Sequence, residues 1–371
     1  MNGVIKRMLP DSRAGITTKL ENKVPAKSIR QSLRQYVRLA PFVVGLASYL
    51  GSITACAQDD QWFSLRNHNP FLQVYGLPSF QTAELAPAGG YRLGVTLDIA
   101  NHADADETPD ESVLIDGESY VLSLSMRNRV SSRLELGIDL PLVAHSSGLF
   151  DNVIEGWHDL LSISNSKRAG PSNQLQLQYS GDATAPFALT ESGFGIGDIR
   201  LTAAVPLVPT GKTRGRRIAV RASLKLPTGN AGALRGSGAA DFSLGFHASH
   251  TGDFAGRELG LTGFAGVLLL GEGDLFPEIQ KRTVGFGGIG AAWRAAERFV
   301  ITAQVYAQGR YLESELDEIG GNSTQLSLGG TYRFARNRWS LSFAIAEDVF
   351  SDATTDVALH LAVRADDRSA R

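Results

Sequence analysis

The side chains best suited to catalysis in this chain of 371 residues are His247 and Ser249, which lie two positions apart. Nucleophilic catalysis needs a base within hydrogen-bond reach of the hydroxyl and a third group that orients the base. Residues two apart on a strand share one face, so this pair meets the first need. Its chemistry would be hydrolysis of a lipid ester, but no orienting carboxylate is evident. We therefore expect the pair to line a polar surface and keep a lipid hydrolase or deacylase as an alternative.

A cluster of carboxylates is the second chemically suggestive feature, and it comprises Asp104, Asp106, Glu107, Asp110 and Glu111. Hard cations such as calcium bind clustered carboxylate oxygens. The spacing of an EF-hand is missing, so we interpret the cluster as a solvated surface loop, with binding to cation-bridged lipopolysaccharide as an alternative. The single cysteine, Cys56, excludes a disulfide framework and a cysteine-based metal site. We expect no metal and no cofactor.

The elements that carry these residues have the pattern of β-strands. From Tyr91 onward, successive segments place a large apolar residue at every second position and a polar or small residue between. Side chains of a strand point alternately to opposite faces, so each segment has one apolar and one polar face. About 12 such segments of about ten residues are joined alternately by short turns and long links, as in an outer-membrane barrel. We predict an all-β fold, an antiparallel transmembrane β-barrel.

Charge and composition narrow the class further. The net charge of -2 offers no basic excess for nucleic acid. The sequence lacks the repeated apolar runs of about 20 residues that a helical membrane protein needs. In a barrel, the apolar face contacts lipid and the polar face lines the lumen. The residues expected to line the lumen are Arg92, Arg133, Glu135, Asp139, Arg200, Arg221, Lys225, Asp241, His247, Arg310 and Arg333. Facing arginines and carboxylates mostly pair, which indicates a filled or poorly conducting interior.

One long link, from His145 to about Phe194, contains apolar residues at three-four spacing that predict a short helix. Asp151 is placed to cap that helix. We expect Ile154 and Trp157 to pack the helix on the barrel mouth or into the lumen. His158 is left open between packing there and gating a pore or contacting a ligand.

The N-terminal region resembles an export signal. Arginines at 30, 34 and 38 precede an apolar run over 39–50, which ends in Ala55-Cys56-Ala57. A basic flank, an apolar run and a small-x-small site predict cleavage near Ala57. The alternative is a lipoprotein signal in which Cys56 is acylated. The predicted organisation is a signal peptide with an extended basic region (1–57), a periplasmic arm or partial plug (58–89), the barrel (90–366) and a polar tail (367–371).

Several stretches carry a resemblance to a known family: Asn69-Pro70-Phe71, Gly76-Leu77-Pro78, Asp98-Ile99-Ala100-Asn101, the segment 148–158, Gly195-Ile-Gly-Asp198 and Thr355-Asp-Val-Ala-Leu-His360. Together they resemble the proteobacterial outer-membrane proteins known as domain of unknown function 3187. The resemblance implies a barrel in the outer membrane of a Gram-negative bacterium and gives no established activity.

We therefore expect a non-enzymatic outer-membrane barrel that passively transports small or hydrophobic molecules. Its expected partners are outer-membrane lipid, lipopolysaccharide, the barrel-assembly machinery and a small hydrophobic ligand. The alternatives to this role are a structural barrel, an outer-membrane lipid hydrolase, and an exported soluble or lipid-anchored β-rich binding protein.

Overall fold

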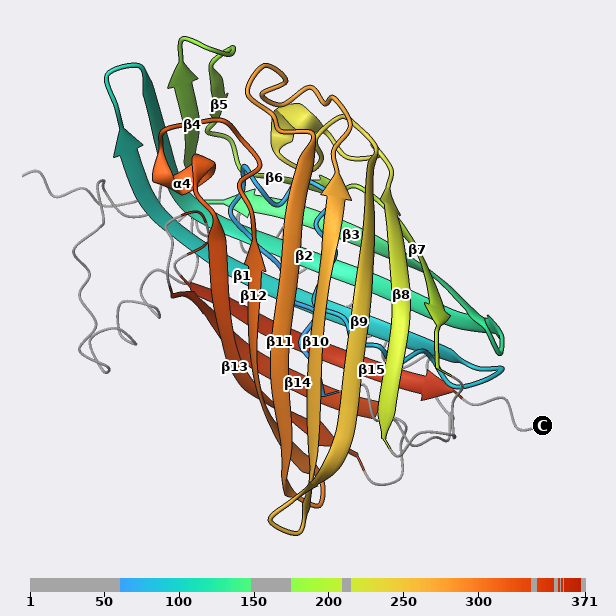
Figure 1. Cartoon of the computed structure of the whole chain (residues 1–371). Coiled ribbons are helices and arrows are strands. Elements are labelled where there is room, and N and C mark those ends of the chain that lie inside the picture. Colours follow the sequence, from blue (N-terminus) through green and yellow to red (C-terminus); the bar gives the residue numbers. More distant parts are fainter. Residues whose placement is uncertain are drawn as a thin grey trace, which may run out of the picture. The chain divides into compact units, whose positions relative to one another are not determined.

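The computed structural model describes residues 61–147, 175–208, 215–334, 339–349, 353, 355 and 357–367. Within these residues, twelve antiparallel strands close into a barrel (Figure 1). They are β1 (Tyr91–Glu107), β2 (Glu111–Ser131), β3 (Leu134–Ser146), β7 (Arg200–Pro206), β8 (Arg216–Lys225), β9 (Asp241–Phe254), β10 (Arg257–Leu269), β11 (Thr283–Ala296), β12 (Phe299–Gln308), β13 (Ser323–Arg333), β14 (Trp339–Asp348) and β15 (Val357–Asp367). The predicted all-β barrel is confirmed.

Closure depends on the pairing of the first and last strands. β1 pairs with β15 over eleven residue positions, from Tyr91 opposite Asp367 to Asn101 opposite Val357. β1 also pairs with β2, which pairs with β3, and β3 with β7. Among the described residues, the pairings of the twelve barrel strands therefore form a closed ring, which is the condition for a sheet to cross a bilayer.

The two ends of the barrel differ. At one, the short-turn end, β1 begins and tight turns join β2 to β3, β9 to β10 and β11 to β12. The β9–β10 turn has positive φ at both Ala255 (55°) and Gly256 (73°), the geometry of a type I′ hairpin. At the other, the long-loop end, β4 (Gln176–Gly181) pairs with β2 and with β5 (Phe187–Leu189), and β6 (Gly193–Ile196) pairs with β3.

The acidic cluster is a hairpin and not a loop. β1 and β2 continue their register up to Glu107 opposite Ser112. Val113 and Ile115 of β2 are buried in an apolar cluster with Leu177 and Tyr179 of β4. This packing supports the extended strands, and the acidic residues give no sequence sign of it.

Helix is scarce in the described residues. A 3-10 turn spans Ala231–Ala233, and a one-turn helix, α4, spans Asp317–Gly320. The helix predicted around Asp151, Ile154, Trp157 and His158 lies outside the described residues. None of the helices described is long and apolar enough to span a membrane.

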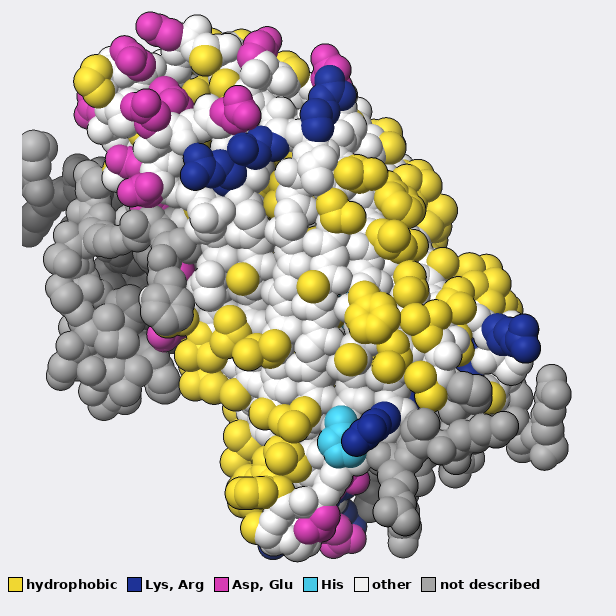
Figure 2. Space-filling view, in the orientation of Figure 1, with side chains coloured by type: hydrophobic (Ala, Val, Ile, Leu, Met, Phe, Trp, Pro, Cys, Tyr) yellow, Lys and Arg dark blue, Asp and Glu magenta, His cyan; other side chains and the backbone are white. Residues whose placement is uncertain are grey.

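Burial alternates along the barrel strands as the pattern predicted. In β9, Asp241, Ser243 and His247 are buried, whereas Phe242, Leu244 and Phe246 are exposed. Exposed leucine, isoleucine, valine and phenylalanine side chains recur on the outer face of the other strands. Figure 2 shows them spread over the barrel wall, with acidic side chains gathered mostly at the long-loop end. An outer apolar face around a polar interior fits lipid outside the barrel, and this protein is a transmembrane β-barrel.

Residues 61–90, here called the plug segment, run through the interior of the barrel. Thr302 of β12 donates to the carbonyl of Gln61, and the side chain of Gln304 bonds both the N–H and the carbonyl of Phe63. The chain then reaches the long-loop end, where Asn69 donates to the carbonyl of Glu318. It returns toward the short-turn end and enters β1. Most of the segment expected as a periplasmic arm or partial plug therefore lies in the lumen.

An apolar cluster fills the long-loop end around the turn of the plug segment. Tyr75 stacks on Tyr311 with ring centroids 5.1 Å apart, and Phe71 lies 5.7 Å from Phe276. All four rings are almost fully buried. This cluster closes the lumen on that side, and the polar contacts lie below it.

Candidate functional site

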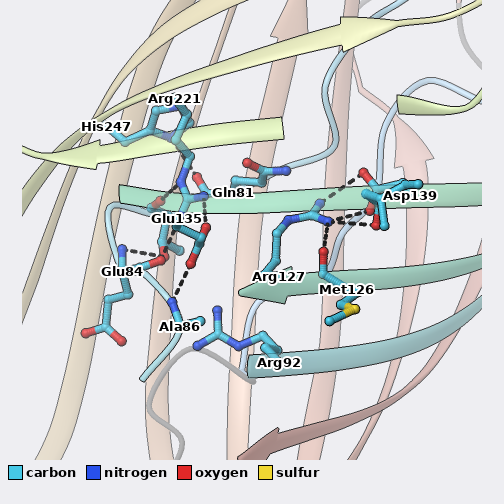
Figure 3. A network of polar contacts seen from close by, with 12 residues as sticks. Gln81, Glu84, Ala86, Arg92, Met126, Arg127, Glu135, Asp139, Arg221 and His247 are labelled. Atoms are coloured by element: carbon cyan, nitrogen blue, oxygen red, sulfur yellow. Dashed lines mark hydrogen bonds and ion pairs between the residues drawn. The ribbon is translucent and has the colours of Figure 1, made fainter. Parts of the chain in front are cut away.

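The lumen, with the plug segment inside it, is the candidate site. Residues 81–86 of the plug segment run back toward the short-turn end and are here called the descending arm. Arg221 of β8 holds this arm (Figure 3). Its Nε donates to the carbonyl of Thr82 at 2.7 Å, and its Nη2 donates to the carbonyl of Glu84. Its Nη1 pairs with Glu135 of β3 at 2.9 Å, and Glu135 in turn accepts the N–H of Ala86. One buried ion pair therefore joins two strands to three positions of the plug segment.

A second anchor lies at the C-terminal end of β8. Lys225 is 1% exposed, and its Nζ lies 2.6 Å from Asp198 and 3.1 Å from Asp241. The same ammonium donates to the carbonyl of Val74 at 3.1 Å. Asp241 also accepts the N–H of Gly76 at 2.8 Å. A Cβ added to Gly76 would lie 2.5 Å from the Cβ of Asp241, so only glycine allows this approach.

Asp198 occupies a break in the barrel wall between β6 and β7. Its carboxylate accepts the N–H groups of Gly229 and Ser237 in addition to the Lys225 ammonium. The Gly-Ile-Gly-Asp stretch singled out in the sequence thus ends one strand and turns a carboxylate inward. These three contacts from neighbouring residues satisfy the hydrogen-bonding capacity of the Asp198 carboxylate.

Histidines form a separate polar cluster in the lumen. His360 of β15 lies 2.6 Å from Asp98 of β1, and His68 of the plug segment lies 3.7 Å from the same carboxylate. Burial is the main cause that lowers the pKa of His68 to about 4, against the opposing charge of Asp98. Nearby, Ser119 bridges His102 and His145 with two 3.0 Å contacts. In the described residues, no group of three or more His, Cys, Asp or Glu side chains is placed to hold a metal ion.

The pair proposed for ester hydrolysis is engaged elsewhere. His247 contacts the carbonyl of Gln81 at 3.0 Å through Nδ1, and its ring stacks on Phe264. Ser249 accepts the N–H of Ala83 at 3.1 Å and contacts the hydroxyl of Thr262 at 2.9 Å. Both residues face the lumen, and both bind the plug segment. This arrangement positions the plug and assembles no nucleophile with a base.

The expected lumen residues fall into two groups. Most lie inside, namely Arg92, Glu135, Asp139, Arg200, Arg221, Lys225, Asp241 and His247, and Arg333 is half-buried with its guanidinium 3.3 Å from the side chain of Gln61. Arg133 and Arg310 are instead exposed at opposite ends of the barrel. Arg133 lies in the β2–β3 turn and Arg310 follows β12. The polar-face pattern placed them inside because it carries no information on where each strand ends.

Among the residues that the structure describes, three cavities follow one side of the plug segment. The middle one has a volume of about 120 Å³ and is bounded by the plug and by strands β1, β2, β3, β7, β8 and β15. It shares Arg66, Asp198 and Arg200 with a narrow cavity of about 10 Å³ toward the long-loop end. It shares Arg92 with a cavity of about 960 Å³ at the short-turn end. The lumen is therefore occupied but incompletely filled.

Four further charged side chains line this site, namely Arg66, Asp98, Arg127 and Arg364. Arg66 belongs to the plug segment, which has no periodic pattern that would indicate its place in the lumen. Asp98, Arg127 and Arg364 stand on the polar faces of their strands, so alternation carries the signal for them. Arg127 makes a bidentate pair with Asp139, at 2.7 and 2.9 Å.

A comparison with protein-family models finds a family without an assigned role. Residues 41–366 match the family model described as protein of unknown function (DUF3187). No curated protein matches the chain. Among solved structures, the chain is similar to an outer membrane channel from Pseudomonas putida F1, with 14% identity, a TM-score of 0.49, and coverage of 76% of this chain and 97% of that one.

Two further solved structures are described as toluene transporters. The one from Ralstonia pickettii is 14% identical, with a TM-score of 0.37 and coverage of 77% of this chain and 91% of that one. The one from Pseudomonas putida is 12% identical, with a TM-score of 0.35 and coverage of 82% of this chain and 98% of that one.

Proposed function

The chain belongs to the family described as protein of unknown function (DUF3187), and within that frame we propose that it is a gated outer-membrane channel for passive transport of small polar solutes. The observation that carries the proposal is the line of cavities beside the plug segment, which share residues from one to the next. Small or hydrophobic cargo was expected from the sequence. The polar lining of the middle cavity favours small solutes that are polar and not hydrophobic.

The plug segment is the gate in this proposal. The upper cavity, at about 10 Å³, is at the lower limit for a single water molecule, so the path is closed as it stands. Polar bonds hold the arm from Gln81 to Ala86 against β3, β8 and β9. Displacement of this arm joins the middle cavity to the wide one at the short-turn end. Movement of the turn around Tyr75 is then needed to open the far side.

A removable cross-link tests this gate. The N–H of Ala83 lies 3.1 Å from the hydroxyl of Ser249, so the double variant Ala83→Cys/Ser249→Cys places two thiols across the plug and the wall. The single cysteine of the sequence, Cys56, falls in the predicted signal peptide and does not compete. We expect planar-bilayer recordings to show openings of the reduced protein that vanish on oxidation and return with reductant.

The same recording can contradict the proposal. Equal conductance in the oxidised and reduced forms, with the cross-link verified by mass, would mean that solute passage does not depend on this arm. No conductance in either form would remove the transport function and leave a structural barrel. Heat-modifiable migration on gels verifies that each variant is folded before it is recorded.

A further inference from the structure

Two arginines in the middle cavity, Arg66 and Arg200, make no hydrogen bond or ion pair with the described residues, although Asp139 attracts Arg200 and Asp98 attracts Arg66 at longer range. Arg200 of β7 is 5% exposed, and its Nε is buried without a hydrogen-bond acceptor. Arg66 of the plug segment lines the same cavity and is half-buried. The two positive charges are within electrostatic range of each other. A wall residue and a plug residue therefore present two guanidinium groups to one enclosed space.

The charges around this cavity do not balance. Six arginines line it, against four carboxylates. Each of the carboxylates has a partner at short range: Asp139 with Arg127 at 2.7 Å, Glu135 with Arg221 at 2.9 Å, Asp198 with Lys225 at 2.6 Å and Asp98 with His360 at 2.6 Å. Arg92 pairs with Asp366 at 2.8 Å, outside the lining of the cavity. The sixth arginine, Arg364, donates to the carbonyl of Trp62. Arg66 and Arg200 are then the arginines of this cavity for which the described residues provide neither a hydrogen bond nor an ion pair.

An unpaired guanidinium that is removed from bulk water is costly, because the desolvation of a buried charge amounts to several kcal/mol unless a counter-charge or hydrogen bonds offset it. The guanidinium fork matches the two oxygens of a carboxylate or phosphate. A cavity needs roughly 10–15 Å³ to hold one water, so one of about 120 Å³ accepts a small oxyanion with some of its hydration water.

We infer that Arg66 and Arg200 form a binding site for a small oxyanion, a carboxylate or phosphate group, inside the lumen. Arginines also line the adjoining cavities, with Arg235 on the side of the long-loop end and Arg92 and Arg217 on the other. The side-chain Nε of Arg235 likewise lacks an acceptor in the described part of the chain. The site thus lies within a positively charged series along the proposed route. As a statement about cargo, it rests on the proposed channel function and makes that channel selective for anions.

Direct binding tests the site without any need for transport. The purified full chain in zwitterionic detergent, free of chloride, is titrated calorimetrically with inorganic phosphate and separately with acetate. A hydrogen bond to a charged group contributes about 1.5–3 kcal/mol, so we expect Arg66→Gln and Arg200→Gln each to weaken binding about tenfold or more. The matched control, Arg282→Gln, removes an exposed loop arginine that pairs with Glu272 and should bind as the wild type does.

The two probes separate the sources of the oxyanion. Stronger binding of phosphate indicates a phosphate-bearing solute, and comparable or stronger binding of acetate indicates a carboxylate. If Arg200→Gln fails the heat-modifiable migration test, Arg66→Gln carries the measurement, because Arg66 stands on the plug segment and outside the strand ladder. The site would be overturned if the folded Arg66→Gln and Arg200→Gln proteins still bound phosphate and acetate as the wild type does. It would also be overturned if the wild type bound neither probe.

Reversal potentials in a salt gradient then separate this inference from the channel itself. If anion selectivity falls in Arg66→Gln and Arg200→Gln and stays in Arg282→Gln, the result supports both the oxyanion site and the channel. Binding that depends on the two arginines without conductance in any variant retains the site and removes the channel. Conductance with unchanged ion selectivity in the two lumen variants, together with no oxyanion binding, retains the channel and removes the site.

Discussion

Arg221 is the residue through which the grip on the plug segment can be measured. It donates to the carbonyls of Thr82 and Glu84 and pairs with Glu135. A hydrogen bond from a charged donor contributes about 1.5–3 kcal/mol, so loss of the two bonds to the plug weakens its docking by about 3 kcal/mol or more. Removal of one partner of a buried ion pair costs a further amount, because Glu135 is left charged and unpaired.

We expect Arg221→Gln to lower the free energy of local opening of the descending arm by about 3 kcal/mol, which corresponds to roughly a hundredfold faster exchange of its protected amides. The informative amides are those of Ala83 and Ala86, which donate to Ser249 and to Glu135. Hydrogen exchange of the folded protein, read by mass spectrometry on peptides covering 79–90, measures the change. Peptides from β12 should exchange as in the wild type.

Two companion variants sharpen the measurement. Glu135→Gln keeps an acceptor for the Ala86 N–H and should accelerate exchange less than Arg221→Gln. In the double variant no charge is left unpaired, so its effect should be smaller than the sum of the two single effects. Arg282→Gln is the control for loss of one arginine. Unchanged exchange of Ala83 and Ala86 in a folded Arg221→Gln protein would refute the view that this residue holds the arm.

Three further predictions concern stability. Lys225→Met leaves Asp198 and Asp241 buried without their shared cation, so unfolding should become easier by about 3–5 kcal/mol, read as a lower temperature for the heat-modifiable gel shift. Phe343→Arg places a charge on the exposed face of β14 and should cost about 2–4 kcal/mol near the bilayer midplane, measured as urea-dependent folding into vesicles, whereas Arg282→Gln should have little effect. Because burial lowers the pKa of His68 to about 4, its contribution is fully present above pH 6.5 and is lost as pH falls from about 6.5 to 4. The protection factors of plug amides near His68, which correct for the slower intrinsic exchange in acid, should therefore fall with acid, less so in His68→Gln.

Some features of this barrel are visible in the sequence because they are local. In β9, the alternation of Asp241, Phe242, Ser243 and Leu244 places two side chains inside and two outside, as observed. A strand repeats every two residues whatever its neighbours are, so the faces, the approximate strands and the polar lumen can all be inferred without a structure. The end of a strand has no such periodic sign, and this is why Arg133 and Arg310 were expected inside and lie at the ends.

The plug segment shows what local reasoning could only outline. Its composition indicated an arm or a partial plug, but the partners of Gln61 and Phe63 lie 241 residues further along the chain. Its backbone groups bond to side chains of the wall, so it needs no strand or helix pattern of its own. A segment without periodicity can therefore be ordered, and the sequence offers no direct sign of that order.

The sequence by itself determined the kind of sheet, its two faces and the abundance of charge on the inner one, since each depends on residues next to one another along the chain. The tertiary structure alone decided which charges meet. Arg221 finds Glu135 across 86 positions, whereas Arg200 and Arg66 form no ion pair with a carboxylate of the described residues, since Asp139, opposite Arg200, is held by Arg127. Pairing is a property of distance in space, and closing the barrel around its own N-terminal segment sets those distances.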